Sequence, residues 1–173
     1  MSEQDAAQAQ AAVGESLAEM AGKYLTFQLG SENYGLQILK VQEIIGIMNV
    51  TKVPRTPSYV RGVINLRGKV IPVIELRVKF GMDTSEDSER TCIIVLQVSH
   101  GDTSLITGII VDEVSEVLDI AANQIEPAPS FGTTVDTEFI LGMGKVGNKV
   151  IMMLDVDRVL SMGDLAALSS LAE

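Results

Sequence analysis

The stretch GVINLRGKVIPVIEL, residues 62–76, has the pattern of two strands joined by a tight turn. Runs rich in Val and Ile flank Arg67-Gly68-Lys69, and these β-branched side chains suit the pleated surface of a sheet. Gly68 can adopt the positive φ that a short hairpin turn needs. Pro72 cannot donate a hydrogen bond to a neighbouring strand, so we expect it at an edge or a bulge. The stretch therefore predicts a β-hairpin.

This hairpin recurs later in the chain. At an offset of 80, five of its residues match Gly142, Lys149, Val150, Ile151 and Asp155; their counterparts are Gly62, Lys69, Val70, Ile71 and Glu75. At an offset of 73, four earlier residues (Gly35, Val41, Glu43 and Ile44) match Gly108, Val114, Glu116 and Val117. The difference between the offsets fits a longer loop in the second half, around residues 126–131. Many short strands, given twice, predict two small β-barrels of similar build. Side chains should fill barrels of this size, which leaves the groove between them as the natural binding site.

Other segments predict the remaining elements. Leu25, Phe27 and Leu29 alternate with polar residues, which is typical of a half-buried strand, and residues 34–39 fit its return strand. Residues 40–45 suggest a short helical or irregular turn. The apolar run at 91–98 predicts a strand that is buried on both faces. Further strands are expected at 104–111, 114–120, 138–146 and 149–156.

The ends and the middle of the chain are more polar. Residues 1–20 are rich in Ala, Gln and Glu and are interpreted as a flexible tail, and the acidic residues 83–90 as a surface loop between the two halves. Residues 161–173 predict a closing helix, because Ser161 and Asp164 have the spacing of a capping box.

Composition narrows the class of protein. Hydrophobic residues make up 46% of the 173 residues, which is enough for a packed core. The net charge of −10 argues against nucleic acid as a partner, because phosphate contacts need Lys and Arg. No apolar run is long enough to span a bilayer and no signal peptide is apparent, so we expect a cytoplasmic protein without direct membrane insertion.

Seven of the thirteen basic residues lie between residues 51 and 80. They fit either the solvated outer face of a few strands or a surface that steers an acidic partner protein.

Catalytic chemistry has little support in the sequence. Cys92, the single cysteine, lies in an apolar strand where burial would make its thiol inert, so a dyad with His100 is disfavoured. The glycines between 142 and 147 lack the ending of a phosphate-binding loop and fit hairpin turns. No metal-ligand motif occurs, although a pair of catalytic carboxylates stays an open alternative.

Two motifs resemble the CheW family of chemotaxis coupling proteins. Residues 34–44, YGLQILKVQEI, are similar to the family pattern YGxxIxxVxEI, and residues 62–77 are similar to GVxNLRGxVxPVxDLR. Glu75 stands where Asp is usual, which is a conservative departure. Residues 111–117 and 127–131 also fit, so the resemblance runs from about residue 24 to about residue 160.

The resemblance implies an all-β (mainly β) fold of two SH3-like, five-stranded barrels around a shared hydrophobic core, with short helices including one at the C-terminus. We expect the CheW-like domain at 21–160, with barrels at about 21–82 and 91–156 and room for strand exchange between them. The implied function is that of an adaptor. It couples methyl-accepting chemoreceptors to the chemotaxis histidine kinase in signalling arrays at the inner face of the membrane, without catalysis, cofactor or metal.

The resemblance also implies the binding residues. Its partners are the cytoplasmic hairpin tip of the receptor and the regulatory domain of the kinase. The receptor-facing candidates are Val41, Glu43, Gly62, Arg67, Ile93 and Val117. Val41, Ile93 and Val117 would offer apolar surface, and Arg67 would supply charged hydrogen bonds. Phe131 would contact the kinase in arrays.

Three alternatives stay open. One is a related adaptor of a non-flagellar pathway that controls pili or surface sensing. The others are a hydrolase or transferase with unrecognised carboxylates and a sensor that binds a small ligand between the barrels.

Overall fold

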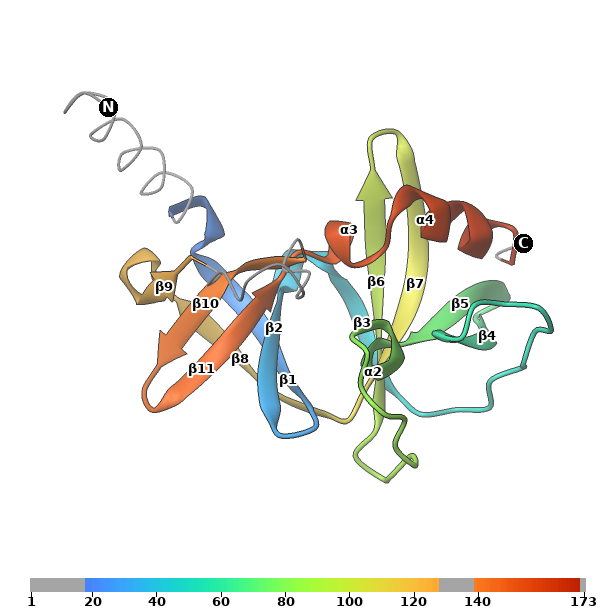
Figure 1. The fold of residues 1–173 in the computed structure, drawn as a ribbon, viewed down its shortest axis with the longest axis horizontal. Helices are drawn as coiled ribbons and strands as arrows, with labels where there is room; N and C mark the ends of the chain where they lie inside the picture. The colour runs from blue at the N-terminus through green and yellow to red at the C-terminus, as the bar shows by residue number, and fades with distance from the viewer. Residues whose placement is uncertain (1–17, 128–138, 172–173) are drawn as a thin grey trace.

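The computed structural model describes residues 18–127 and 139–171, which form two β-sheets and several short helices (Figure 1). The larger sheet has the strand order β8-β1-β2-β11-β10-β9. Its strands are β1 (Gly22–Leu29), β2 (Glu32–Gln37), β8 (Glu113–Ile120), β9 (Ile125–Glu126), β10 (Ile140–Val146) and β11 (Lys149–Leu154). The smaller sheet has the order β3-β6-β7-β5-β4. Its strands are β3 (Val41–Gly46), β4 (Val60–Leu66), β5 (Lys69–Glu75), β6 (Cys92–His100) and β7 (Thr103–Val111).

The two halves of the chain exchange hairpins. The β1–β2 hairpin of the first half lies between β8 and β11, and the β6–β7 hairpin of the second half lies between β3 and β5. In the parallel pairing of β2 with β11, Gly35 lies opposite Met153. In the parallel pairing of β5 with β7, Val73 lies opposite Gly108. The offsets of 73 and 80 relate these two pairs, so the sequence repeat corresponds to a repeat in strand pairing.

The expected division of the chain at 21–82 and 91–156 left room for strand exchange, and the strand order shows such an exchange. Residues 22–37 pair with strands from 113–154, and residues 41–75 pair with strands from 92–111. Among the described residues the chain crosses between the sheets twice. It crosses at the 3₁₀ turn Ile38–Lys40, between β2 and β3, and at Asp112, between β7 and β8.

Three apolar clusters hold the sheets together. The largest lies between the sheets and takes buried residues from both, including Phe27, Leu36, Ile74 and Leu96. Each sheet also encloses a cluster of its own, one around Ile93 in the smaller sheet and one around Ile120 in the larger. The mainly β fold with a shared hydrophobic core is therefore confirmed.

Most predicted elements are present. The strand at 91–98 is confirmed as β6, in which residues 93–96 are all buried. Pro72 lies inside β5, but the pairing of β5 with β7 begins only at Val73. The missing N–H of Pro72 therefore interrupts no hydrogen bond of that parallel pairing.

The prediction for residues 40–45 was wrong. Residues 41–46 form β3, in which half-buried and exposed residues alternate. The charged Glu43 occupies one of the half-buried positions, which hides the alternation of a strand in the sequence.

Short helices complete the fold. α2 (Leu76–Lys79) follows β5, α3 (Val156–Val159) follows β11, and the 3₁₀ turn Ala122–Gln124 precedes β9. The closing helix α4 (Met162–Ser169) begins with the predicted capping box. The Asp164 N–H donates to Ser161 Oγ at 3.1 Å, and the Ser161 N–H donates to Asp164 Oδ2 at 2.9 Å. In the part of the chain that the structure describes, no helix is long and apolar enough to cross a membrane.

Candidate functional site

The turn between β4 and β5 presents Arg67 at the tip of the hairpin. Leu66 and Lys69 are paired, so Arg67 and Gly68 form a two-residue turn, with φ of 53° and 84°. Gly68 adopts this conformation freely, whereas a residue with a side chain loses about 1 kcal/mol there. The Asn65 side chain stabilises the turn by accepting a hydrogen bond from the Gly68 N–H at 2.9 Å. An unfavourable backbone conformation at an exposed arginine suggests that its side chain serves a function.

Arg67 forms a two-pronged ion pair with Glu43 of β3. Its Nη1 and Nη2 atoms each lie 2.7 Å from a Glu43 carboxylate oxygen. The Glu43 hydrogen bonds raise the pKa of Arg67, and an arginine guanidinium is charged at neutral pH in any case. The Arg67 side chain is 75% exposed. A planar, accessible guanidinium of this kind can bind a carboxylate or backbone carbonyl of another protein.

Val41 lies on the same strand as Glu43. It is half-buried and packs against the cluster between the sheets. The structure therefore brings Glu43 and Arg67 into contact, whereas Val41, two residues earlier on β3, lies across a register shift and faces the cluster between the sheets. These three residues are called the β3 surface below.

Gly62 and Ile93 have positions inside the fold. A Cβ atom on Gly62 would lie 2.1 Å from the Thr51 carbonyl oxygen, so only glycine fits there. Ile93 is 0% exposed and belongs to the cluster enclosed by the smaller sheet. It cannot offer the apolar surface expected of it. A run that is apolar on both faces of a strand gives no sign of which residues reach the surface.

Val117 lies apart from the β3 surface. It is an exposed residue of β8 in the larger sheet, where it is the counterpart of the exposed Ile44 of β3. On the larger sheet, Val117 thus occupies the position that Ile44 occupies on the smaller sheet. Phe131 lies outside the described residues.

One exposed residue beside the β3 surface escaped the sequence analysis. Leu39, in the 3₁₀ turn before β3, is 96% exposed. A surface hollow of about 350 Å³ lies beside it, lined by Leu39, Lys40, Gln42, Gln97 and Ser99. A leucine within an alternating strand pattern is normally assigned to the core. Only the turn that interrupts this pattern could have indicated its exposure.

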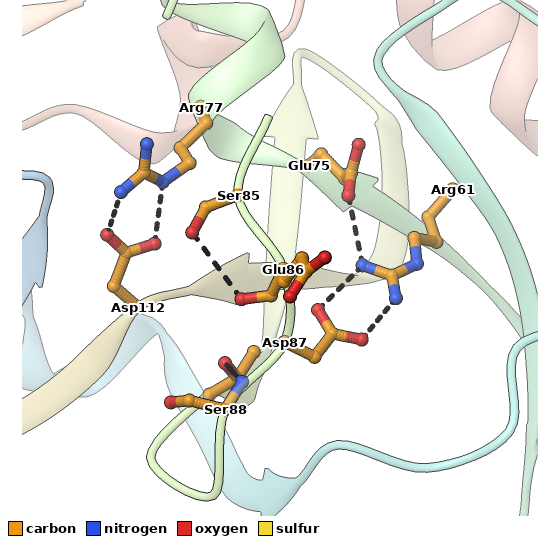
Figure 2. A network of polar contacts seen from close by, with 9 residues as sticks. Arg61, Glu75, Arg77, Ser85, Glu86, Asp87, Ser88 and Asp112 are labelled. Atoms are coloured by element: carbon orange, nitrogen blue, oxygen red, sulfur yellow. Dashed lines mark hydrogen bonds and ion pairs between the residues drawn. The ribbon is translucent and has the colours of Figure 1, made fainter. Parts of the chain in front are cut away.

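The basic stretch at 51–80 is largely engaged within the protein. Four of its seven basic residues form ion pairs with acidic residues of this chain: Arg61 with Glu75 and Asp87, Arg67 with Glu43, Arg77 with Asp112, and Lys79 with Asp164. Figure 2 shows Arg61 between Glu75 and Asp87, and Arg77 facing Asp112. These contacts favour the interpretation that most of these charges stabilise the fold, with Arg67 the most accessible of the four.

Among the described residues, neither the Cys92–His100 dyad nor the glycine loop gains geometric support. Cys92 and His100 lie at opposite ends of β6, about 26 Å apart at the usual rise of a strand, so they cannot form a dyad. His100 Nε2 lies 2.7 Å from the Leu160 carbonyl oxygen, to which it donates. Gly142 and Gly144 lie within β10, and Gly147 lies in the turn that follows. Within residues 18–127 and 139–171, no group of three or more His, Cys, Asp or Glu side chains is arranged to hold a metal ion.

Comparison with known proteins gives a consistent result. The model of the CheW-like domain matches residues 23–164. Chemotaxis protein CheW of Klebsiella aerogenes is 41% identical over 164 residues, which cover 94% of this chain and 96% of that protein. Chemotaxis protein CheW of Helicobacter pylori is 35% identical over 138 residues, which cover 80% of this chain and 81% of that protein.

A solved structure agrees with these matches. The crystal structure of scaffolding protein TtCheW from Thermoanaerobacter tengcongensis superposes with a TM-score of 0.73 at 38% identity. The superposition covers 83% of this chain and 95% of that one. The match of sequence and fold over nearly all of the described residues shows that this chain belongs to the family of CheW-like domain proteins.

Proposed function

We propose that the protein is a chemotaxis adaptor that couples methyl-accepting chemoreceptors to the chemotaxis histidine kinase. In this proposal it works in the cytoplasm, at receptor arrays on the inner face of the membrane. It acts through protein contacts, without catalysing a reaction, and so regulates the kinase. The observation that carries the proposal is the family match over residues 23–164, together with 41% identity to a named chemotaxis protein.

The β3 surface is the proposed receptor contact. Val41 supplies apolar area at the edge of the core between the sheets, and Arg67 supplies an accessible guanidinium held in place by Glu43. A helix of the receptor tip fits such a surface, because it can present an apolar side chain and a hydrogen-bonding group one turn apart. Gly62 has a structural role in this proposal, because the missing side chain lets β4 approach the backbone at Thr51.

Two further residues belong to the proposal in different ways. Val117 lies on the equivalent strand of the larger sheet, so we assign it to a separate contact from that of Arg67. Phe131 is proposed as a kinase contact on the basis of the motif that precedes it. Contacts on both sheets suit an adaptor, because several weak contacts in one array raise each other's effective concentration.

A binding experiment tests the proposal. The full chain is titrated with a receptor tip fragment and, separately, with the regulatory domain of the kinase. We expect both to bind with dissociation constants on the order of micromolar. Binding of neither at concentrations of several hundred micromolar would remove the adaptor function.

The matched variants are Val41→Met and Val150→Met. Val41→Met alters the β3 surface with a flexible side chain, whereas Val150 is an exposed residue of β11 in the larger sheet. We expect weaker receptor binding only for Val41→Met, with kinase binding retained in both. Equal receptor affinity in the two variants would exclude Val41 from the contact.

A further inference from the structure

Both crossings of the chain between the two sheets are held by a carboxylate. The first crossing, Ile38–Lys40, leads from β2 of the larger sheet into β3 of the smaller. The second, Asp112, leads from β7 of the smaller sheet into β8 of the larger. A displacement at either crossing would move one sheet relative to the other, because the backbone passes directly between them there.

At the second crossing Asp112 joins parts of both sheets, and Figure 2 shows its contact with Arg77. Its Oδ1 atom accepts a hydrogen bond from Arg77 Nε at 2.7 Å, and Arg77 lies in α2, directly after β5 of the smaller sheet. Its Oδ2 atom accepts a hydrogen bond from the Gly30 N–H at 2.8 Å, in the turn between β1 and β2 of the larger sheet. Burial would raise the pKa of Asp112, but these hydrogen bonds outweigh it and lower the pKa. The carboxylate is therefore charged at neutral pH.

At the first crossing Asp157 has the corresponding role. It lies in α3, directly after β11 of the larger sheet. Its Oδ2 atom accepts a hydrogen bond from Lys40 Nζ at 3.0 Å, at the crossing itself. Its Oδ1 atom accepts one from the Ser99 N–H at 2.8 Å, in β6 of the smaller sheet.

The helix residues of the two contacts are related by the repeat and carry opposite charges, whereas the crossing residues Lys40 and Asp112 are one position out of register in the repeat. Arg77 and Asp157 are 80 residues apart, which is the offset that relates the two hairpins, and each is the second residue of a one-turn helix. In one contact the helix supplies the cation and the crossing supplies the carboxylate. In the other the helix supplies the carboxylate and the crossing supplies the cation. At both crossings, a carboxylate and a cation thus join a one-turn helix to the crossing, with different residues in each case.

We infer that Asp157 and Asp112 are positioning residues that fix the orientation of the two sheets relative to each other. Asp157 holds Lys40 and thereby sets where β3 begins, which places Val41 and Glu43 for the partner. Asp112 does the same for β8, which carries Val117. The Lys40 and Asp157 side chains keep about a third of their surface exposed. Such ion pairs contribute little to global stability, so their effect is on orientation.

The unbound full chain provides the first test. Residual dipolar couplings of the ¹⁵N-labelled protein report the orientation of each sheet. In Asp157→Asn and Lys40→Met we expect each sheet to keep its internal couplings while the relative orientation of the sheets changes or becomes averaged. Lys40→Arg, which keeps the cation, should retain the original orientation. Lys145→Met is the matched control, because Lys145 pairs with Glu126 at 2.7 Å within the larger sheet alone.

The expected effect on binding rests on the proposed function, whereas the expected effect on orientation does not. The outcomes therefore test the two separately. An unchanged orientation in both Asp157→Asn and Lys40→Met, or an equal change in Lys145→Met, would overturn the inference. With a receptor tip fragment as probe, we expect about fivefold weaker binding by Asp157→Asn, the lower end of coupling between sites. The orientation measurement needs no partner, so failure of the unmodified protein to bind would overturn only the adaptor function.

Discussion

The turns of the two equivalent hairpins both begin with a residue of positive φ, but they differ at the second residue, where Gly68 has a φ of 84° and its counterpart Asn148 has no positive φ. Arg67 occupies the first turn with φ of 53°, and its counterpart Gly147 occupies the second with φ of 61°. Glycine satisfies this backbone at no steric cost, whereas arginine does not. Glu43, the partner of Arg67, also has a counterpart in Glu116 of β8, but glycine offers that residue no cation. The comparison teaches that the fold does not require Arg67, which supports a role for its side chain at the surface.

Tyr59 and Phe139 are a second pair of equivalent residues, with the same backbone hydrogen bond but different side chains. The Tyr59 carbonyl accepts a hydrogen bond from the Glu75 N–H at 2.7 Å, and the Phe139 carbonyl accepts one from the Asp155 N–H at 2.8 Å. The Tyr59 hydroxyl also donates to Asp164 of α4 at 2.6 Å. Phe139 has no hydroxyl and stacks on Phe80, with ring centroids 4.6 Å apart. One hydroxyl group thus helps to attach the C-terminal helix beside the smaller sheet.

The largest difference in stability between equivalent substitutions in the two halves is expected at Gly62 and Gly142. Gly62→Ala would bring a Cβ atom to 2.1 Å from the Thr51 carbonyl oxygen, in a rigid backbone. We expect the free energy of unfolding to fall by about 3 kcal/mol or more. The counterpart Gly142→Ala meets its nearest atom, the Glu126 carbonyl oxygen, at 2.9 Å, so its loss should be smaller. Urea unfolding measures both, and equal losses would contradict the comparison.

The next largest effect is expected on receptor affinity, from a substitution in the first hairpin turn. Arg67→Gly gives the first turn the residue of the second, so it removes the guanidinium and relieves the backbone. We expect receptor affinity to fall about tenfold, which corresponds to about 1.4 kcal/mol, while the melting temperature changes little. Titration with a receptor tip fragment and a thermal melt measure the two quantities. Full affinity would show that Arg67 is not a binding residue, and a large loss of thermal stability would show that the fold requires it.

The repeat in the sequence predicted where single strands lie, and it also predicted which positions of the two halves are equivalent in the strand pairing. Its offsets match the parallel pairs Gly35–Met153 and Val73–Gly108. It could not predict the exchange of hairpins, because the same offsets would hold if each hairpin stayed within its own half. That choice depends on the shared core and on the crossings at Ile38–Lys40 and Asp112, which are too short to show a pattern.

The candidate site was predictable in part. The motif around Glu43 and Arg67 identified two residues that the fold brings into contact. Exposure could not be predicted for Ile93 or Leu39. The pattern alone cannot distinguish the two faces of a fully apolar strand, and it does not show where a 3₁₀ turn removes a leucine from the core.

Tyr59→Phe tests the attachment of α4 and should reduce stability by about 1 kcal/mol at neutral pH, because one hydrogen bond to a carboxylate is lost. Burial would raise the pKa of Asp164, but hydrogen bonds from Lys79, Tyr59 and Ser161 outweigh it and lower the pKa to about 2. A lowered pKa means that this stabilisation is present above 3.8, the ordinary pKa of the group, and is lost as the pH falls toward 2.

Urea unfolding between pH 7 and pH 2 checks this prediction. The loss of stability below pH 4 should be shallower in Tyr59→Phe than in the unmodified protein. The control is Tyr24→Phe, whose hydroxyl donates to the Met20 carbonyl and not to a carboxylate. An identical change in pH dependence for the two variants would show that the Tyr59 hydroxyl does not act through Asp164.

The smallest effect is expected to be a gain in stability. Thr107 of β7 is the counterpart of Tyr34 of β2, and it is fully buried. Its hydroxyl has no hydrogen-bond partner among the described residues. A buried, unpaired hydroxyl is unfavourable, so Thr107→Val, which keeps the shape, should raise the free energy of unfolding by roughly 0.5–1 kcal/mol. Thr26→Val is the control, because the buried Thr26 hydroxyl donates to the Glu116 carbonyl at 2.7 Å and its loss should be destabilising. Urea unfolding of both variants gives the sign directly. A loss of stability in Thr107→Val would mean that a buried water molecule satisfies the hydroxyl.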